Sequence, residues 1–331
     1  MSALSLGVSF TDPGLESRVH AGVSAIEKQL AIAVDSPEKF VAEAAAHLMN
    51  AGGKRFRPLL VLLAAEFGEP THADVVPSAV VVELTHLATL YHDDVMDEAP
   101  LRRGAQSANA RWDNSVAILV GDYLFAQASE IVAGLGPDAV RIQAQTFSRL
   151  VHGQIRETLG PDPEDDALAH YLSVVADKTG SLIATAALFG ARMSGASDEI
   201  QRALSEFGER IGAAFQLRDD IIDIASETGD SGKTPGTDLR EGVPTLPVLL
   251  ALRSTDPADA RLRSLLSRPL ADDAEHAEAL ALLRKHPAMD EARAYVRAEA
   301  DAARALLGRL PDLPARAALE TLCDTVATRL S

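Results

Sequence analysis

Apolar residues recur at the spacing of an α-helix along almost the whole chain, from Leu15 onward. No segment of usable length alternates Val, Ile or Thr with polar residues, as a half-buried strand would. Aromatic residues make up only 4% of the 331 residues, while alanine and leucine are abundant, so helix is favoured over sheet. We therefore predict an all-α protein, a single-domain helical bundle.

The predicted helices are joined by polar connections, two of which are long enough to carry function. The helices are expected at 15–34, 37–50, 57–67, 75–97, 109–133, 138–159, 165–179, 181–194, 198–225, 245–254, 257–268, 272–285, 289–308 and 313–329. The connection at 98–108 holds paired arginines, and the one at 226–244 is rich in Gly, Pro, Thr and Asp. Residues 1–14 are expected to form a mobile tail and residues 15–331 one domain.

Charge and cysteine content narrow the possible partners. The formal net charge is −17, so nucleic acid and anionic lipid are repelled and are not expected as partners. Cys323 is the only cysteine, which excludes an intramolecular disulfide. The N-terminus has no basic segment followed by an apolar run, and no stretch has the ~18–20 uninterrupted apolar residues of a membrane span. We expect a cytoplasmic protein without an integral membrane segment.

An Asp-Asp-x-x-Asp cluster occurs twice, each time at the end of an apolar helix. Asp93 and Asp97 are one helical turn apart and share a face, and Asp219 and Asp223 repeat that spacing. The negative end of the helix dipole makes such pairs unfavourable unless a cation lies between them. Mg²⁺ suits this place because it needs only one or two carboxylates plus waters and phosphate oxygens. A solvated acidic helix end would explain one cluster, but two indicate metal sites around a diphosphate.

Basic residues follow or face these clusters on an otherwise acidic chain. The segment GGKRFRP at 52–58 places three cations before an apolar helix, where backbone amides also favour anions. The others are Arg102 and Arg103, Lys178 beside Thr179, and Lys233. Each alone would be an ordinary surface cation. Together they suggest two diphosphate sites, one bridged by metal and one metal-free.

In combination, these segments resemble the trans-type isoprenyl diphosphate synthases, or polyprenyl synthetases, over about residues 15–330. The matching segments, in order, are GGKRFRP at 52–58, HLATLYHDDVMDEAPLRRG at 86–104, GDYLFA at 121–126, HGQIRE at 152–157, KTGSL at 178–182, FQLRDDIID at 215–223 and GKTPGTDLREGVPTLP at 232–247. One departure is Val243, where many relatives carry lysine. It weakens only an additional phosphate contact.

The resemblance implies a role for each matched residue. The magnesium ligands would be Asp93, Asp97 and Asp219, with Asp94, Asp220 and Asp223 completing the motifs. The allylic diphosphate would be held by Arg102, Lys178 and Lys233, helped by Thr179 and Gln216. Isopentenyl diphosphate would be held by Lys54, Arg57, His86 and Arg103. The residues expected to act on the leaving group are Asp93, Asp94, Asp97, Lys178, Asp219 and Lys233. Three Mg²⁺ ions per active site and a homodimer are also implied.

The implied reaction condenses isopentenyl diphosphate head-to-tail with a farnesyl or geranylgeranyl primer. The product would be a long-chain all-trans polyprenyl diphosphate for a quinone side chain. The growing tail should run beneath Asp93, where Thr89, Ala88 and Thr85 are all small. In this family, aromatic residues there stop growth early. Phe147, two turns before Gln154 on the same helix face, is the expected floor of the tunnel.

Other readings stay open. A short-chain farnesyl or geranylgeranyl synthase would share every motif. A class I terpene cyclase also uses an aspartate motif, but it would usually lack GGKRFRP and the second such motif. A regulatory subunit of a two-component synthase would have eroded aspartates. The GDSGKT segment at 229–234 resembles the end of a P-loop, but Glu227 replaces the required glycine and a helix precedes it, which excludes that reading.

Overall fold

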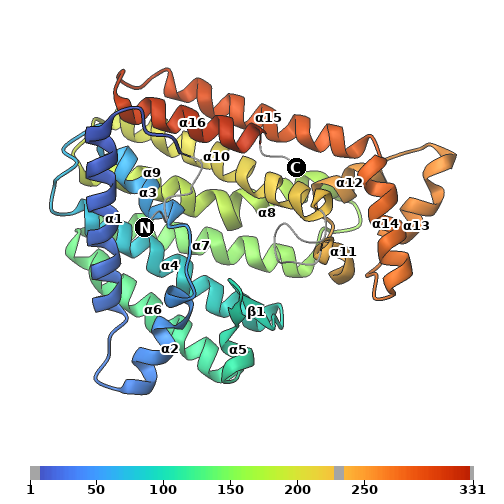
Figure 1. The fold of residues 1–331 in the computed structure, drawn as a ribbon, viewed down its shortest axis with the longest axis horizontal. Coiled ribbons are helices and arrows are strands. Elements are labelled where there is room, and N and C mark those ends of the chain that lie inside the picture. The colour runs from blue at the N-terminus through green and yellow to red at the C-terminus, as the bar shows by residue number, and fades with distance from the viewer. Residues whose placement is uncertain (1–7, 227–234, 329–331) are drawn as a thin grey trace. The chain divides into compact units, whose positions relative to one another are not determined.

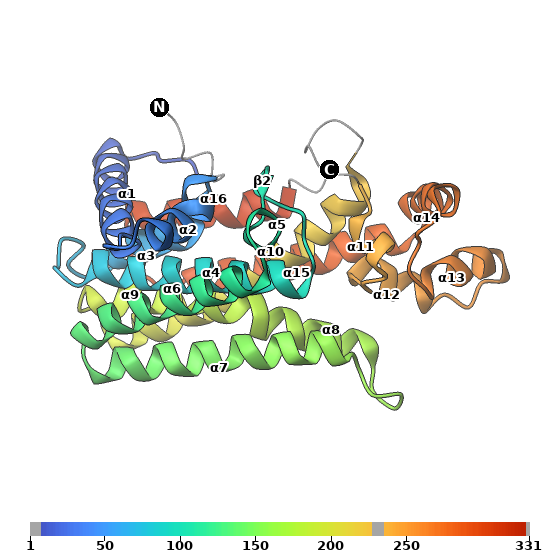
Figure 2. The same ribbon diagram turned by 90° about the horizontal axis from the view of Figure 1, so that it is seen from below.

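The computed structural model describes residues 8–226 and 235–328. These residues form helices joined by short connections (Figure 1 and Figure 2), so the predicted all-α fold is confirmed. The chain packs as two compact units. Of the described residues, unit 1 holds 8–148, 182–208 and 306–321, and unit 2 holds 149–181, 209–226, 235–305 and 322–328.

Unit 1 contains the N-terminal helices, drawn in blue to green in Figure 1. Its complete elements are α1 (Pro13–Ala33), α2 (Lys39–Asn50), α3 (Phe56–Ala65), α4 (Val75–Met96), β1 (Leu101–Arg102), β2 (Ala105–Gln106), α5 (Ala108–Arg111) and α6 (Asn114–Gly134). It also takes parts of α7 (Pro137–Leu159), α9 (Ser181–Met193), α10 (Asp198–Ala225), α15 (Ala288–Leu307) and α16 (Pro314–Thr328). Helix α4 packs along α6 at the centre of this unit. Buried Tyr91 ties α4 to α2 because its hydroxyl donates to the Ala44 carbonyl at 2.5 Å.

Unit 2 contains the remaining parts of those shared helices and a group of shorter ones. Its complete elements are α8 (Ala167–Val175), a π-helix (Ala176–Gly180), α11 (Thr237–Glu241), α12 (Leu246–Leu252), a 3₁₀ turn (Pro257–Asp259), α13 (Ala260–Leu266) and α14 (Asp273–Lys285). Helices α13 and α14, in orange, lie side by side. The His276 imidazole contacts the Gly236 carbonyl at 2.9 Å and so joins α14 to the segment before α11.

The sequence-based helix boundaries differ from the structure where local chemistry intervenes. Helix α1 begins at Pro13 rather than Leu15, because the Asp12 carboxylate caps it by accepting from the Leu15 amide at 2.5 Å. The single helix expected at 109–133 is broken near Trp112, and Asp113 caps α6 through the Val116 amide at 2.8 Å. A two-stranded hairpin of β1 and β2, which the sequence did not indicate, lies within the connection at 98–108.

Two helical stretches, Asn114–Gly134 and Ala167–Met193, have the length and composition of a membrane span. Core helices of globular proteins share both properties. The second stretch is mostly buried, with 61% of its most apolar window inside the protein, and it carries Lys178 in its π-helical turn. Helix α6 packs along α4. In the first stretch only 33% of the most apolar window is buried, so packing against α4 covers part of α6 and leaves the rest exposed.

Candidate active site

The first aspartate motif closes α4. The Asp94 carboxylate is fully buried and accepts from Arg102 Nε at 2.6 Å. Burial raises the pKa of Asp94, while the hydrogen bond from Arg102 lowers it. The Asp97 side chain is 49% exposed and only 3.8 Å from the Arg102 guanidinium. The middle aspartate is thus held inside unit 1, and Asp97 faces outward, where a metal can reach it.

The β-hairpin directs its two arginines to different partners. Arg102 lies on β1 beside Asp94, whereas Arg103 occupies the turn with a left-handed φ of 56°. Its guanidinium donates to the Leu48 carbonyl at 3.0 Å and to the Gly52 carbonyl. A Cβ at Gly53 would lie 2.9 Å from the Arg103 guanidinium, so a side chain there would displace that guanidinium. The hairpin therefore links the first aspartate motif to the GGKRFRP segment.

Arg57, Arg103 and the His86 imidazole form a cluster whose arginine charges are offset only in part by Glu83. The Arg57 Nε is buried and has no hydrogen-bond partner among the described residues. Burial lowers the pKa of Arg57 to about 10, and burial together with neighbouring arginines holds the pKa of His86 well below its usual range. Arg103 also has a lowered pKa from burial. Lys54 is exposed at the edge. Such a cluster is suited to a multiply charged anion.

Arg55 in the same segment stabilises the fold through ion pairs. It takes a left-handed φ of 49°, and its buried guanidinium pairs with Glu27 at 2.7 Å and with Glu83 at 3.1 Å. Glu83 is only 2% exposed, so its carboxylate relies on this ion pair in place of contacts with water. The sequence analysis counted Arg55 among the three cations of GGKRFRP but gave it no substrate-binding role, and its position alone could not show where the guanidinium points.

Arg55→Ala is expected to lower the free energy of unfolding by about 3–5 kcal/mol, because it removes the direct ion-pair partner of the buried Glu83 carboxylate. Arg261→Ala, at an exposed pair with Glu278, is the matched control and should leave the free energy of unfolding almost unchanged. Urea unfolding of both variants measures the difference. Equal losses would show that the Arg55 pair contributes no more than a surface ion pair.

The GDYLFA segment of α6 packs against the end of α4. Gly121 on α6 lies against His92, and a Cβ at Gly121 would be 2.2 Å from the imidazole Nε2. That nitrogen is 3.2 Å from the Ile118 carbonyl and 3.4 Å from an Asp122 carboxylate oxygen. His92 precedes Asp93 directly, so the glycine allows α6 to support the end of α4 that carries the motif.

The second aspartate motif lies at the end of α10 in unit 2, and it too combines a buried aspartate with an exposed one. The Asp219 carboxylate is 46% exposed and 2.8 Å from the Arg218 guanidinium. Asp220 is buried, accepts from Gln216 Nε2 at 3.0 Å and also accepts from the Tyr171 hydroxyl. Burial raises the pKa of Asp220 to about 7. Asp223 accepts from the Asp238 amide at 3.4 Å. Here again the middle aspartate is internal, but the outward-facing carboxylate described here is the first of the motif, whereas in the first motif it is the last.

Lys178 and Thr179 lie on the π-helix between α8 and α9. π-Helical turns are rare and occur often at functional sites. The Lys178 ammonium pairs with Glu157, and the Thr179 hydroxyl donates to Gln216 Oε1 at 3.2 Å. Gly153 on α7 is needed beside this turn, because a Cβ would approach the Lys178 amide to 2.8 Å. Lys233, the remaining predicted cation, lies outside the described residues.

The carboxylates fit magnesium bound together with a substrate. Within the described ranges, no group of three or more His, Cys, Asp or Glu side chains could hold a metal alone. Outward-facing aspartates such as Asp97 and Asp219 offer one or two oxygens each. Mg²⁺ accepts such a partial set and completes its shell with water and phosphate oxygens. The donor set therefore matches an ion that arrives with a diphosphate.

The predicted chain-length residues lie together in unit 1. Ala88 and Thr85 are buried on α4, while Thr89 is half-buried one turn before the motif. Thr85 accepts from Gln143 Nε2 at 2.5 Å, which joins this part of α4 to α7. Phe147 follows Gln143 by one turn, and its ring stacks on that of Phe125 from α6 with centroids 4.1 Å apart.

Phe125 and Gln143 were missed by sequence reasoning. Phe125 lies within the GDYLFA segment, which matched the family but gave no indication that Phe125 contacts Phe147. Gln143 precedes Phe147 by one turn, and this spacing is the only sequence signal that linked it to the predicted floor. The Gln143 Oε1 is buried and has no partner among the described residues. Gln143, one turn before Phe147, therefore contacts Thr85, one of the small residues of α4.

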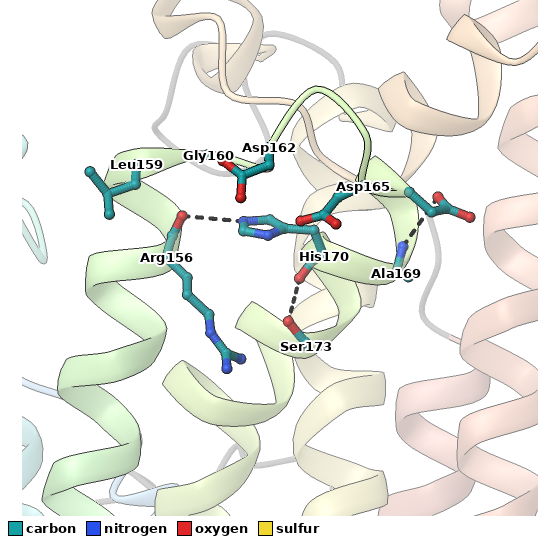
Figure 3. Close-up of a pocket in the computed structure, with 9 residues that line it drawn as sticks. Arg156, Leu159, Gly160, Asp162, Asp165, Ala169, His170 and Ser173 are labelled. Atoms are coloured by element: carbon teal, nitrogen blue, oxygen red, sulfur yellow. Dashed lines mark hydrogen bonds between the residues drawn. The ribbon is translucent and has the colours of Figure 1, made fainter.

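A pocket of about 670 Å³ opens elsewhere in unit 2, between the end of α7 and the start of α8 (Figure 3). Its lining is Arg156, Leu159, Gly160, Asp162, Asp165, Asp166, Ala169, His170 and Ser173. Asp166 is occupied as the cap of α8 and as the partner of Arg253 at 2.7 Å. His170 contacts the Arg156 carbonyl at 3.2 Å. None of the predicted site residues that the structure describes lines this pocket.

Each unit therefore carries an aspartate motif with its own cations, on an all-helical frame. This combination defines a prenyltransferase of the isoprenyl diphosphate synthase class. The family model described as polyprenyl synthetase matches residues 38–283. The chain belongs to the polyprenyl synthetase family, which confirms the resemblance found in its sequence.

Named relatives and solved structures match over nearly the full chain. Nonaprenyl diphosphate synthase of Mycobacterium tuberculosis is 52% identical, over 98% of this chain and 97% of that protein. Geranylgeranyl pyrophosphate synthase of Corynebacterium glutamicum, solved with calcium and isoprenyl diphosphate, is 49% identical with a TM-score of 0.89, covering 98% and 99% of the two chains. A decaprenyl diphosphate synthase from Rhodobacter capsulatus is 33% identical with a TM-score of 0.87, covering 96% and 98%.

Proposed function

We propose that this chain condenses isopentenyl diphosphate head-to-tail with a farnesyl or geranylgeranyl primer and makes a long-chain all-trans polyprenyl diphosphate. The observation that carries the proposal is the pairing of two kinds of site. Two intact aspartate motifs offer outward carboxylates for metal. Separately, Arg57, His86 and Arg103 form a cluster whose charge no described carboxylate fully neutralises. A synthase needs both, since its two substrates carry one diphosphate each.

Mg²⁺, when bound by Asp93, Asp97 and Asp219, would supply positive charge to the leaving diphosphate. The allylic C–O bond breaks, and the diphosphate leaves with the electron pair. The double bond of isopentenyl diphosphate then attacks the allylic cation and forms the new C–C bond. One proton is lost to the released diphosphate, and a new allylic double bond forms. The chain supplies no side-chain nucleophile.

The chain's own cations would hold the two diphosphates. Arg102, Lys178 and Lys233 would hold the allylic diphosphate, with hydrogen bonds from Thr179 and Gln216. Lys54, Arg57, His86 and Arg103 would hold isopentenyl diphosphate without metal. The lowered pKa of His86 keeps its imidazole neutral, so it would donate one hydrogen bond rather than a charge. Lys178 would have to exchange its pairing with Glu157 for the diphosphate.

The proposed product length depends on the small side chains that precede Asp93 on α4. Ala88 and Thr85 are ~7.5 and ~12 Å along the helix axis from Asp93 at 1.5 Å per residue. Neither would block a prenyl tail at that depth, and Phe147 with Phe125 would form the floor. Relatives named as nonaprenyl and decaprenyl synthases support a long product. The geranylgeranyl synthase of Corynebacterium supports the shorter alternative.

Several finer points belong to the same proposal. Residues 15–331 would act as one catalytic domain, because the reaction uses both aspartate motifs. Three Mg²⁺ ions would bind with the diphosphate. The enzyme would be a cytoplasmic homodimer without an integral membrane segment, and its product would supply a quinone side chain.

The assignment of cations to two diphosphates predicts opposite kinetic effects. Arg57→Ala and His86→Ala should raise the KM for isopentenyl diphosphate more than that for the allylic primer, whereas Lys178→Ala and Lys233→Ala should do the reverse. Each lost charged hydrogen bond is worth about tenfold or more. Lys28→Ala, on the exposed face of α1, is the control. If all four variants shifted both constants equally, the assignment would be wrong although the enzyme class could stand.

A further inference from the structure

Tyr171 has no role in the chemistry described above, yet its side chain reaches the second aspartate motif. Its hydroxyl donates to Asp220, which is only 5% exposed. The other Asp220 oxygen accepts from Gln216 at 3.0 Å, and Gln216 accepts in turn from Thr179 at 3.2 Å. These four side chains form a continuous hydrogen-bonded chain across three elements of unit 2.

We propose that Tyr171 is a positioning residue. Through Asp220 and Gln216 it holds the second aspartate motif and the π-helix in a fixed position relative to each other. The proposal rests on the function proposed above. A buried carboxylate needs donors, and here Tyr171 and Gln216 supply one for each oxygen. Asp220 is therefore fixed on the inner side of α10, which presents the adjacent Asp219 outward.

The far end of the hydrogen-bonded chain fixes the phosphate-binding turn. Thr179 follows Lys178 on the π-helix, a rare conformation that occurs often at functional sites. The Thr179–Gln216 bond ties that turn to the same face of α10 that holds Asp220. Removing the Tyr171 hydroxyl frees one end of this arrangement and leaves a buried oxygen of Asp220 unsatisfied.

Tyr171→Phe removes one oxygen and keeps the ring, so the fold should survive. We expect kcat to fall about tenfold or more. The half-saturating Mg²⁺ concentration and the KM for the allylic primer should rise severalfold, while the KM for isopentenyl diphosphate changes less than about twofold. Tyr295→Phe, at a half-buried tyrosine of α15 in the same unit, is the matched control and should leave kcat, the Mg²⁺ dependence and both KM values unchanged.

A double-variant cycle tests whether Tyr171 acts through the hydrogen-bonded chain. Thr179→Val breaks its other end without touching Tyr171. The combined variant should lose no more turnover than the worse single variant, because both act on one unit. Additive losses would overturn the proposal, as would a fall in Tm with unchanged Mg²⁺ and primer dependence. If the wild type itself consumed no isopentenyl diphosphate, the proposed function would fail instead, and the two failures are therefore distinguishable.

Discussion

Asp93→Ala and Asp219→Ala are each expected to reduce turnover by about 10²–10³-fold or more with the fold intact. The lost carboxylate would remove a metal ligand and with it the stabilisation of the leaving diphosphate, where even one oxyanion donor is worth that factor. Asp97 and Asp219 face outward in the structure, unlike buried Asp94 and Asp220. Steady-state turnover at saturating substrates and Mg²⁺ measures the effect, and EDTA should abolish activity of the wild type.

Asp290→Ala is the matched control because its carboxylate is 87% exposed at the start of α15. It should retain wild-type turnover. Circular dichroism and Tm must be unchanged in all three variants for the comparison to hold. Near-normal turnover by either motif variant, or full activity in EDTA, would contradict the role given to the two motifs.

With a geranyl primer, Ala88→Phe is expected to shorten the product to the farnesyl or geranylgeranyl class while the primer is still consumed. The buried Ala88 lies ~7.5 Å along α4 from Asp93 by helical rise, so a ring there would stop the second or third added unit. Ala21→Phe, on the exposed face of α1, is the control and should leave product length unchanged. An unaltered product from Ala88→Phe would mean that the tail follows another face of α4.

The opposite change is expected at the aromatic pair. Phe147→Ala and Phe125→Ala each remove one ring of the stack, whose centroids are 4.1 Å apart. Either variant should lengthen the product or broaden its distribution, because the remaining ring loses its support. Mass spectrometry of the extracted products measures this. If only Phe147→Ala had an effect, Phe125 would be packing rather than part of the floor.

Much of the fold could be predicted because helical periodicity is a local property. Helix α10 was predicted with its observed limits, 198–225, since its apolar stripe is uninterrupted. The predicted helix at 165–179 missed the change to π-helix at Ala176, where α7 packs so closely that a Cβ at Gly153 would lie 2.8 Å from the Lys178 amide nitrogen. The break near Trp112 was missed because Asp113 was not recognised as a cap.

The sequence identified the residues of the candidate site but not the directions in which their side chains point. Spacing identified both aspartate motifs, yet it could not show that Asp94 and Asp220 point inward to Arg102 and Tyr171. Partners distant in sequence decide this: Tyr171 is 49 residues from Asp220. The same limit hid the structural role of Arg55, whose partner Glu83 lies 28 residues away.

The most direct test of the proposed function is a product analysis of the purified chain. It would be incubated with isopentenyl diphosphate, Mg²⁺ and, in separate reactions, a geranyl, farnesyl or geranylgeranyl primer, and the products identified by mass spectrometry. We predict consumption of isopentenyl diphosphate and an all-trans polyprenyl diphosphate longer than geranylgeranyl. A product that stops at farnesyl or geranylgeranyl diphosphate with every primer would contradict the long-chain assignment, and no consumption of isopentenyl diphosphate would contradict the function itself.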